Sequence, residues 1–432
     1  MVSARSARAA QSPPFISREV PRPSIPLLRI HHLWGFVLSV TLWGCGSTWS
    51  PETLIEDLRV IGVRADPAEI KPGESAAITA LVFDPSRPGK ATTVFWVGCD
   101  PDPFNLGRSA CSDPVALQDP TALIGAATLP PGVKFIGLNE HATYAVDKNL
   151  FQVLAADDPR RQTGTVGQIL AIAIGAETTG IPTNDELAAL FARVKSKEVQ
   201  AVITLFRVRV SESPSRNQNP VISTFSVAGE LQFPGAHVQL GAAEARTVAI
   251  DATEDSFESF ILDTPTGPKP TVEHLTSAWY STSGRFNYER IALRGAVRGI
   301  FTAPGSPDNP TDVVPLRRKG TLYAVLRDSR GGQTWADYPF FICDTFLEGP
   351  ILTAVHSPAT RADPVVIEGR SLENVLDVIV GGVALENGAF NGLTGNWEAL
   401  VPNSLLGGSY PVRLHGKECR RGETAFTLTI PN

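Results

Sequence analysis

Two kinds of residue could carry catalysis in this chain: a nucleophile beside a base, or histidines that bind a metal. The nucleophile and metalloprotease signatures G-x-S-x-G, S-x-x-K and H-E-x-x-H are all absent from the sequence. The histidines after residue 45 are scattered singly, so we interpret each as an exposed or hydrogen-bonded strand residue: His141, His237, His274, His356 and His415. A triad assembled only in space would escape this search. The linear sequence therefore favours a protein that is not an enzyme.

Two acidic loops, residues 251–255 and Asp100-Pro101-Asp102, could offer oxygen ligands to calcium. Neither has the D-x-D-x-D-G spacing, so we interpret them as solvated acids and expect no metal and no other cofactor. No phosphate-binding G-x-x-x-x-G-K-[ST] loop is present. Trp335 and Tyr338 are the nearest candidates for stacking on a sugar, with packing in the core or at an edge as the alternative.

Cys45 follows an apolar run, Leu33 to Trp43, which is too short to span a hydrocarbon core of ~30 Å but fits a signal-peptide h-region. Leu42-Trp43-Gly44-Cys45 resembles the bacterial lipobox. The resemblance implies lipid on the Cys45 thiol and cleavage after Gly44. The bulky Trp43 departs from that pattern, and an ordinary secretory signal is the alternative. Gly46 implies the outer membrane in similar lipoproteins. We predict a signal peptide over 1–45 and a tether over 46–56.

Four cysteines remain once Cys45 is assigned to the lipid, and three pairings could join them. Sequence proximity favours Cys99 with Cys111 and Cys343 with Cys419. No CxxC pair or neighbouring histidine cluster accompanies them, so zinc is a poor alternative. Disulfides agree with export of the chain to an oxidising compartment.

The 432 residues are too many for one sandwich and favour several domains. The content of 43% hydrophobic and 19% charged residues is ordinary for a globular protein. A net charge of -6 leaves no basic excess for binding phosphates, so we expect no nucleic-acid partner. The 35 prolines and 37 glycines suit short strands and many turns. We predict a mainly β fold of tandem immunoglobulin-like sandwiches.

The first domain is predicted over 57–213. Two strands separated by a Pro-Gly turn precede a strand that carries Trp96, the order expected at the start of an immunoglobulin-like sandwich. An insertion contains one convincing helix, capped by Thr183 or Asn184, with an apolar stripe formed by Leu187, Leu190, Phe191 and Val194. We expect this helix to pack against the sandwich edge, with binding to a partner as the alternative.

The second domain, predicted over 219–345, repeats this outline with Trp279, and residues 328–332 form a hairpin turn before a return strand. The polar, proline-punctuated segment 211–220 marks the boundary between the two domains. Together, these two domains resemble uncharacterised envelope lipoproteins of GC-rich Gram-negative bacteria, a match that supplies no activity.

The third domain is predicted over 349–432. Its series of apolar strands and Gly/Pro turns, from Pro350-Ile351-Leu352 to the strand that ends at Ile430, resembles an IPT/TIG domain. The resemblance implies an immunoglobulin-like fold and an interaction module without catalytic residues.

We therefore expect a non-enzymatic lipoprotein of the cell envelope, in the outer membrane, that binds a protein or a glycan or acts as a rod-like spacer. The membrane is its expected partner through the N-terminal lipid. The alternative is a hydrolase of envelope or extracellular polymers with its site in the region 104–184. The sequence identifies no ligand-binding residue.

Overall fold

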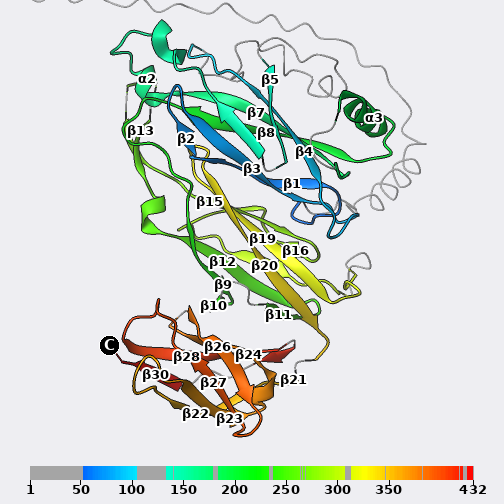
Figure 1. Cartoon of the computed structure of the whole chain (residues 1–432), viewed down its shortest axis with the longest axis vertical. Helices are drawn as coiled ribbons and strands as arrows, with labels where there is room; N and C mark the ends of the chain where they lie inside the picture. Colours follow the sequence, from blue (N-terminus) through cyan, green and yellow to red (C-terminus); the bar gives the residue numbers. More distant parts are fainter. Residues whose placement is uncertain are drawn as a thin grey trace, which may run out of the picture. The chain divides into compact units, whose positions relative to one another are not determined.

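The computed structural model describes residues 52–104, 133–139, 141–178, 183–232, 237–262, 264, 266–267, 269–306, 313–345, 347–381, 383–417, 419–421 and 426–431 (Figure 1). The signal sequence, Cys45 and Cys111 lie outside these residues. Strands carry most of the described chain and form tandem immunoglobulin-like β-sandwiches, so the predicted fold class is confirmed. In this part of the chain, no helix has the length and apolar character that crossing a membrane requires.

The first sandwich is an eight-stranded sheet in the order β1-β3-β6-β5-β4-β7-β8-β2. Because β5 pairs with both β4 and β6, it connects the two layers. After β1 the chain passes Pro67, which has no N–H to donate, and β2 then runs parallel to β8. The strands are β1 (Arg59–Asp66), β2 (Glu69–Ile70), β3 (Ser75–Phe83), β4 (Thr93–Cys99), β5 (Val133–Leu138), β6 (His141–Ala145), β7 (Thr165–Ile174) and β8 (Ala201–Val210).

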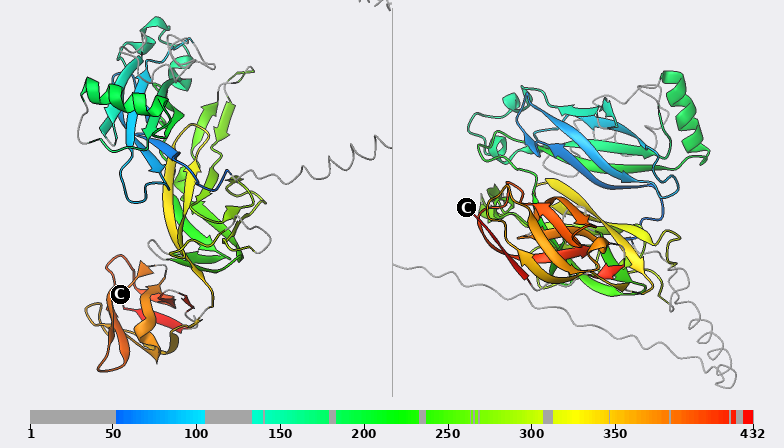
Figure 2. Two further views of the ribbon diagram at one scale, coloured as in Figure 1. Left: turned by 90° about the vertical axis from the view of Figure 1, so that its right-hand side faces the viewer. Right: turned by 60° about the horizontal axis from the view of Figure 1, so that its bottom comes forward.

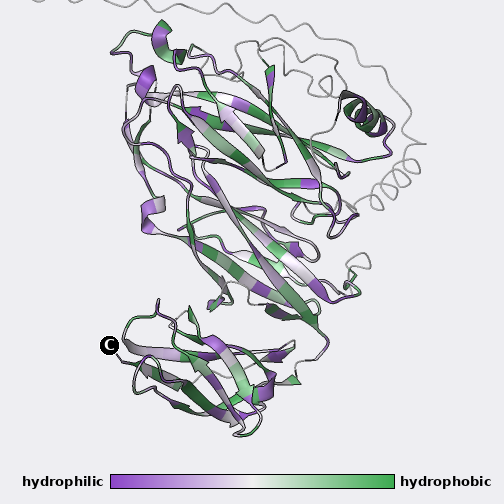
Figure 3. Ribbon diagram, viewed as in Figure 1, coloured by the Kyte–Doolittle hydropathy of each residue, from purple (hydrophilic) through white to green (hydrophobic). Residues whose placement is uncertain are grey.

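Trp96 lies in the centre of the first sandwich, where the sequence predicted it. It is 0% exposed, and its indole N–H donates to the carbonyl oxygen of Asn139 at 2.6 Å. Apolar and polar residues alternate along many of the strands (Figure 3). On β4, Val94 and Trp96 face this inner core, whereas Phe95 and Val97 belong to a second apolar cluster.

Helix α3 (Asn184–Lys195) covers that second cluster, and Figure 2 shows it lying across the strands of the first sandwich. Thr183 caps it: its hydroxyl accepts from the Glu186 N–H, and the Glu186 carboxylate accepts from the Thr183 N–H at 2.8 Å. The predicted stripe packs on the outer face of β4 and β7 rather than at the sandwich edge. Covered on both faces, β7 is apolar almost throughout. The shorter helices here are η3 (Leu150–Val153) and α2 (Arg160–Thr163).

The second sandwich has a similar strand order but divides it between two five-stranded sheets, β10-β9-β12-β18-β16 and β11-β20-β19-β15-β17, with a β13-β14 ribbon. Here β11 runs parallel to β20, as β2 does to β8, and Trp279 on β15 is 1% exposed. The elements are β9 (Ile222–Val227), β10 (Glu230–Gln232), β11 (Val238–Gly241), β12 (Ala245–Ala252), η4 (Glu254–Ser256), β13 (Ser259–Leu262), β14 (Lys269–Val272), β15 (Thr276–Ser281), β16 (Arg285–Phe286), β17 (Arg290–Ala292), β18 (Gly299–Thr302), β19 (Lys319–Arg327) and β20 (Gln333–Cys343).

The third sandwich packs the sheets β22-β23-β27-β26 and β25-β24-β28-β30 around a core that contains Trp397. A two-stranded pair, β21-β29, accompanies it. The elements are β21 (Leu347–Glu348), β22 (Ile351–His356), β23 (Val365–Arg370), η5 (Leu372–Asn374), β24 (Val375–Val380), β25 (Val383–Ala384), β26 (Glu386–Asn391), β27 (Asn396–Leu400), β28 (Gly408–Gly416), β29 (Arg420–Arg421) and β30 (Phe426–Ile430).

The segment before β1 is bound to the second sandwich. Leu54 forms a parallel bridge with Ser281 of β15, whose N–H donates to the Thr53 carbonyl at 2.8 Å. Ile55 is 1% exposed in an apolar cluster that includes Ile61 of β1 and residues of β15 and β19. Residues 53–55, within the segment expected to be a tether, are therefore part of the folded body.

A buried ionic cluster joins the first two sandwiches, and Arg330 is at its centre. The side chain of Arg330 is 3% exposed and those of Glu69 and Glu273 are each 1% exposed. Arg330 Nε donates to Glu273 at 2.6 Å, its Nη1 lies 3.8 Å from Glu69, and its Nη2 donates to Glu258. Arg209 of β8 lies 3.5 Å from the other oxygen of Glu69. Charges from β2 and β8 thus meet charges of the second sandwich.

The linker between these sandwiches continues the cluster. Asn217 is 0% exposed; its N–H donates to Glu69 at 2.8 Å and its side-chain amide to Asp328 at 3.1 Å. Asn219 donates to the Ala65 carbonyl at 2.8 Å and accepts from the Gln333 N–H at 3.0 Å. The polar residues that marked a boundary in the sequence therefore bond both neighbouring sandwiches.

Acids outnumber arginines in this cluster, with Glu69, Glu258, Glu273 and Asp328 around Arg209 and Arg330. Burial raises the pKa of Glu258 and of Asp328. Burial, followed by the charge of Asp328, raises the pKa of Glu273 to about 7 against the opposing effect of Arg330. A cluster with this balance holds a proton more readily than exposed carboxylates do.

We predict that Arg330→Ala lowers the free energy of unfolding by about 3–5 kcal/mol, because it leaves buried carboxylates without their counter-charge. Urea unfolding followed by tryptophan fluorescence measures this. The control is Arg193→Ala, which removes a pair whose side chains are 49% and 61% exposed and should cost at most about 1 kcal/mol. Equal losses in the two variants would contradict the role of the cluster.

The cluster also predicts a pH dependence. A glutamate titrates near pH ~4.3 in an unfolded chain, and Glu273 titrates near 7 in the folded one. Between these values the folded state binds a proton that the unfolded state has lost, so Glu273 makes stability fall as the pH rises through this window. Glu273→Gln should flatten the fall in melting temperature, and the exposed-site control Glu198→Gln should not. An unchanged slope in Glu273→Gln would refute this assignment.

Candidate binding cleft

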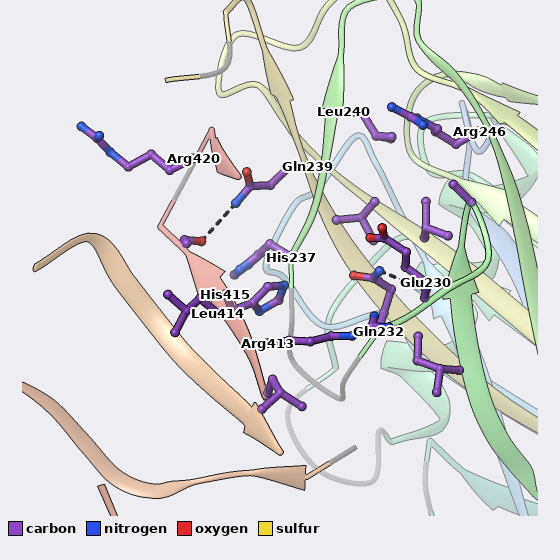
Figure 4. Close-up of a pocket in the computed structure, with 16 residues that line it drawn as sticks. Glu230, Gln232, His237, Gln239, Leu240, Arg246, Arg413, Leu414, His415 and Arg420 are labelled. Atoms are coloured by element: carbon purple, nitrogen blue, oxygen red, sulfur yellow. Dashed lines mark hydrogen bonds between the residues drawn. The ribbon is translucent and has the colours of Figure 1, made fainter. Parts of the chain in front are cut away.

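A polar cleft of about 290 Å³ lies where β10 and β11 of the second sandwich face β28 of the third (Figure 4). Its polar side chains come from positions far apart in the sequence. They are Glu230, Gln232, His237, Gln239, Arg246, Arg413, His415 and Arg420. The apolar residues that complete the lining include Leu240 and Ile379.

Two connections fix the walls of the cleft. Cys343, at the end of β20, forms a disulfide with Cys419, and their Cα atoms are 5.4 Å apart. The side-chain amide of Gln239 donates to the carbonyl oxygens of Gly416 and Lys417, each at 3.1 Å. The disulfide is covalent and β11 runs parallel to β20 beside it, so β11 is held close to the chain around β28.

His237 and His415 meet in this cleft. The ring of His237 lies 4.5 Å from that of Phe341, centroid to centroid. Burial lowers the pKa of His415, the proximity of His237 lowers it further, and Asp377 opposes the shift. At neutral pH, therefore, His415 is uncharged and offers one donor and one acceptor nitrogen.

Hydrogen-bonding groups of both kinds face this space. Arg246 is paired with Glu244, whose other oxygen accepts from the Gly241 N–H at 2.6 Å. The side chain of Arg413 has no hydrogen bond or ion pair with any described residue. Gln239 Oε1 and His415 Nδ1 are buried without a partner among the described residues. Because an unpaired buried polar atom costs ~1–3 kcal/mol, a polar ligand that reached these atoms would be favoured.

This arrangement suits binding rather than covalent chemistry. The described lining offers guanidinium, imidazole, amide and carboxylate groups and no serine, threonine or cysteine nucleophile. The uncharged His415 also lacks a nearby hydroxyl or thiol to activate within that lining. The cleft therefore presents hydrogen-bond donors and acceptors of fixed position.

Sequence reasoning missed the cleft. It interpreted the histidines as single residues, and the structure brings His237 and His415 together from positions 178 residues apart in the chain. Of the others, His356 bonds Glu368 at 2.9 Å. No periodic pattern could have paired two histidines on different sandwiches.

The cysteines divide between the described and undescribed parts of the chain. The Cys343–Cys419 disulfide is present, as sequence proximity predicted. Cys99 is disulfide-bonded, and Cys111 lies outside the described residues, so their pairing stays a prediction. Cys45 also lies outside them, and its lipidation stays a prediction.

The aromatic residues considered for sugar stacking do not form an exposed platform. Tyr338 is 8% exposed, and its ring stacks on that of Phe225 with centroids 3.7 Å apart. Trp335 is half-buried, packs on Gly62 and lies under the Arg64 guanidinium at 5.2 Å. Tyr338 therefore packs in the core and Trp335 packs at an edge, which is the alternative to sugar stacking.

The acidic loops considered for calcium have carboxylates that pair with basic side chains. Asp100 pairs with Lys134 at 2.7 Å, and Glu254 pairs with Arg294. Within the described ranges, no three His, Cys, Asp or Glu side chains are placed to hold one ion.

The region 104–184, the alternative site for a hydrolase, is described only in part. There, Arg160 pairs with Asp158 and Arg161 with Glu212. Hydrogen bonds from Arg160 lower the pKa of Asp158 to about 2. The Tyr144 hydroxyl donates to the Cys99 carbonyl at 2.8 Å, and burial raises its pKa. These groups have structural partners, and nothing in the described part of the region favours catalysis.

No protein-family model and no curated protein sequence matches the chain. Among solved structures, it is similar to the SGBP-B protein of a Bacteroides ovatus mixed-linkage glucan utilization locus, in complex with a heptasaccharide: 14% identity over 49% of this chain and 64% of that one, TM-score 0.16. The chain thus spans less than two thirds of that protein. The chain is also similar to SGBP-B from a complex xyloglucan utilization locus in Bacteroides uniformis. The match has 11% sequence identity, covers 49% of this chain and 48% of that one, and has a TM-score of 0.15. A third match is to the tandem immunoglobulin repeats of Dlar. It has 12% sequence identity, covers 49% of this chain and 98% of that one, and has a TM-score of 0.20.

Proposed function

We propose that this protein is a non-enzymatic envelope lipoprotein, anchored by lipid on Cys45, whose sandwiches form a binding module for a glycan. The cleft between β11 and β28 is its proposed ligand site. The outer membrane is the proposed location, on the basis of Gly46. The proposed folding units are residues 57–213, 219–345 and 349–432, the last of them IPT/TIG-like.

The observation that carries this proposal is that a polar cleft sits between walls that are cross-linked. The Cys343–Cys419 disulfide and the two hydrogen bonds of Gln239 hold the walls together. Groups held in place before a ligand arrives lose little entropy on binding. A module that recognises a ligand without changing it needs this property and no nucleophile.

A polyhydroxylated ligand fits the chemistry of the cleft. Each sugar hydroxyl both donates and accepts a hydrogen bond. The cleft offers it the donors of Arg413, the acceptors of Glu230 and the side-chain amide of Gln232. At about 290 Å³, the space lies just below the ~300–1,000 Å³ typical of small-molecule sites, so it suits a short saccharide. A protein ligand is the other class that the fold permits.

We expect neutral oligosaccharides to bind the wild-type chain and Arg413→Ala to bind them at least about tenfold more weakly, because a charged hydrogen bond contributes ~1.5–3 kcal/mol. Isothermal titration calorimetry measures both affinities. Arg370→Ala, which changes an exposed arginine outside the cleft, is the matched control.

Two results would overturn the glycan assignment: no heat of binding for the wild type with any oligosaccharide, or equal affinity in the Arg413→Ala and wild-type proteins. If the wild type bound an envelope protein and Arg413→Ala abolished that binding, the ligand of the cleft would be a protein rather than a glycan.

The lipid anchor is tested separately. Cys45→Ser removes the thiol that is acylated, so it should leave an unprocessed precursor, whereas the wild type should partition into the detergent phase. Mass spectrometry of the mature N-terminus identifies the modified residue. An unmodified chain that begins at another residue would contradict the proposed lipid anchor.

A further inference from the structure

Four exposed arginines gather in one short segment of the second sandwich. Residues 285–298, here called the arginine arm, contain Arg285, Arg290, Arg294 and Arg298, and Glu289 is the one acid among them. Among the described residues, Arg294 pairs with Glu254, whereas the other three arginines form no ion pair. The arm is therefore basic in a chain whose net charge is -6.

The arm also exposes apolar surface. The side chains of Tyr288 and Val297 are 51% and 47% exposed. Tyrosine beside arginine is the combination that settles at the headgroup level of a bilayer, where the ring meets the acyl boundary and the guanidinium meets phosphate.

Residues 52–54, the first that the structure describes, lie beside this arm. Arg290 pairs with Ala278 on β15, and Leu54 bridges Ser281 on the same strand, three residues further along it. The Phe286 N–H, in the arm, donates to the Thr53 hydroxyl at 3.5 Å. Burial and the neighbouring Glu52 carboxyl raise the pKa of Glu289. The first described residues of the chain thus lie against the arm.

Covalent geometry then limits how far the arm can be from a membrane. Seven peptide units separate Cys45 from Glu52, and even a fully extended chain of that length spans only ~25 Å. A lipid on Cys45 would therefore keep the arm within reach of the headgroups, and this step rests on the proposed anchoring.

We propose that the arginine arm is a membrane-contact surface that binds anionic phospholipid. Lipidated Cys45 and the arm together make two attachments to one bilayer. The arm fixes which side of the second sandwich faces the lipid, a choice that a lipid on a free tether leaves open.

The test uses the lipid-free chain from residue 46 onward, because residues 51–432 form one compact unit. It should co-sediment with vesicles of phosphatidylcholine and phosphatidylglycerol in equal parts, lose this binding as salt is raised, and ignore pure phosphatidylcholine. Replacing Arg285, Arg290 and Arg298 by Gln should weaken binding at least about tenfold. The matched control replaces three exposed arginines outside the arm, Arg207, Arg317 and Arg370, by Gln.

If both triple variants lost vesicle binding equally, the binding would depend on net charge alone and the proposal would be overturned. Failure of the wild-type protein to bind the anionic vesicles would also overturn it. Binding to soluble polyglutamate but not to vesicles would assign the arm to an acidic polymer instead. Mass spectrometry of the native N-terminus detects the lipid independently of vesicle binding. Absence of the lipid anchor can therefore be distinguished from failure of the arginine arm to bind membranes. Circular dichroism confirms that both variants are folded.

Discussion

The contact between Arg330 and its carboxylates is the interaction on which the arrangement of the first two sandwiches depends. A guanidinium that is almost fully buried meets Glu69 of one sandwich and Glu258 and Glu273 of the other. Its face lies 4.9 Å from the ring of Phe260, which adds a cation–π contact. Removing Arg330 would leave these buried carboxylates without their shared counter-charge. The cluster therefore specifies one docking of the sandwiches in a way that apolar surfaces alone do not.

The position of Arg330 also shows why the sequence could not predict the cluster. Residues 328–332 read as a hairpin turn, and they are one: Asp328 accepts from the N–H groups of Arg330, Gly331 and Gly332 at 2.7–2.8 Å. A charged residue in a turn is normally solvated, and no local pattern distinguishes this one. The acids that it meets are 57, 72 and 261 residues away in the chain.

Features with a local signal were predictable. The tryptophans of β4 and β15, the cap at Thr183 and the turn before β20 follow from strand patterns, capping chemistry and turn composition. The helix was recognised but expected at an edge, because its stripe predicts an apolar partner and not which surface supplies it. The cleft had no signal at all, since His237 and His415 become neighbours only after two sandwiches have folded.

The Cys343–Cys419 disulfide has a consequence for proteolysis. It joins residues 76 positions apart, and the peptide between β20 and β22 lies inside the loop that it closes. A protease that cut there would leave the third sandwich attached through sulfur. The nicked protein would migrate as one chain until a reductant was added, so release of this sandwich would need two chemical events rather than one.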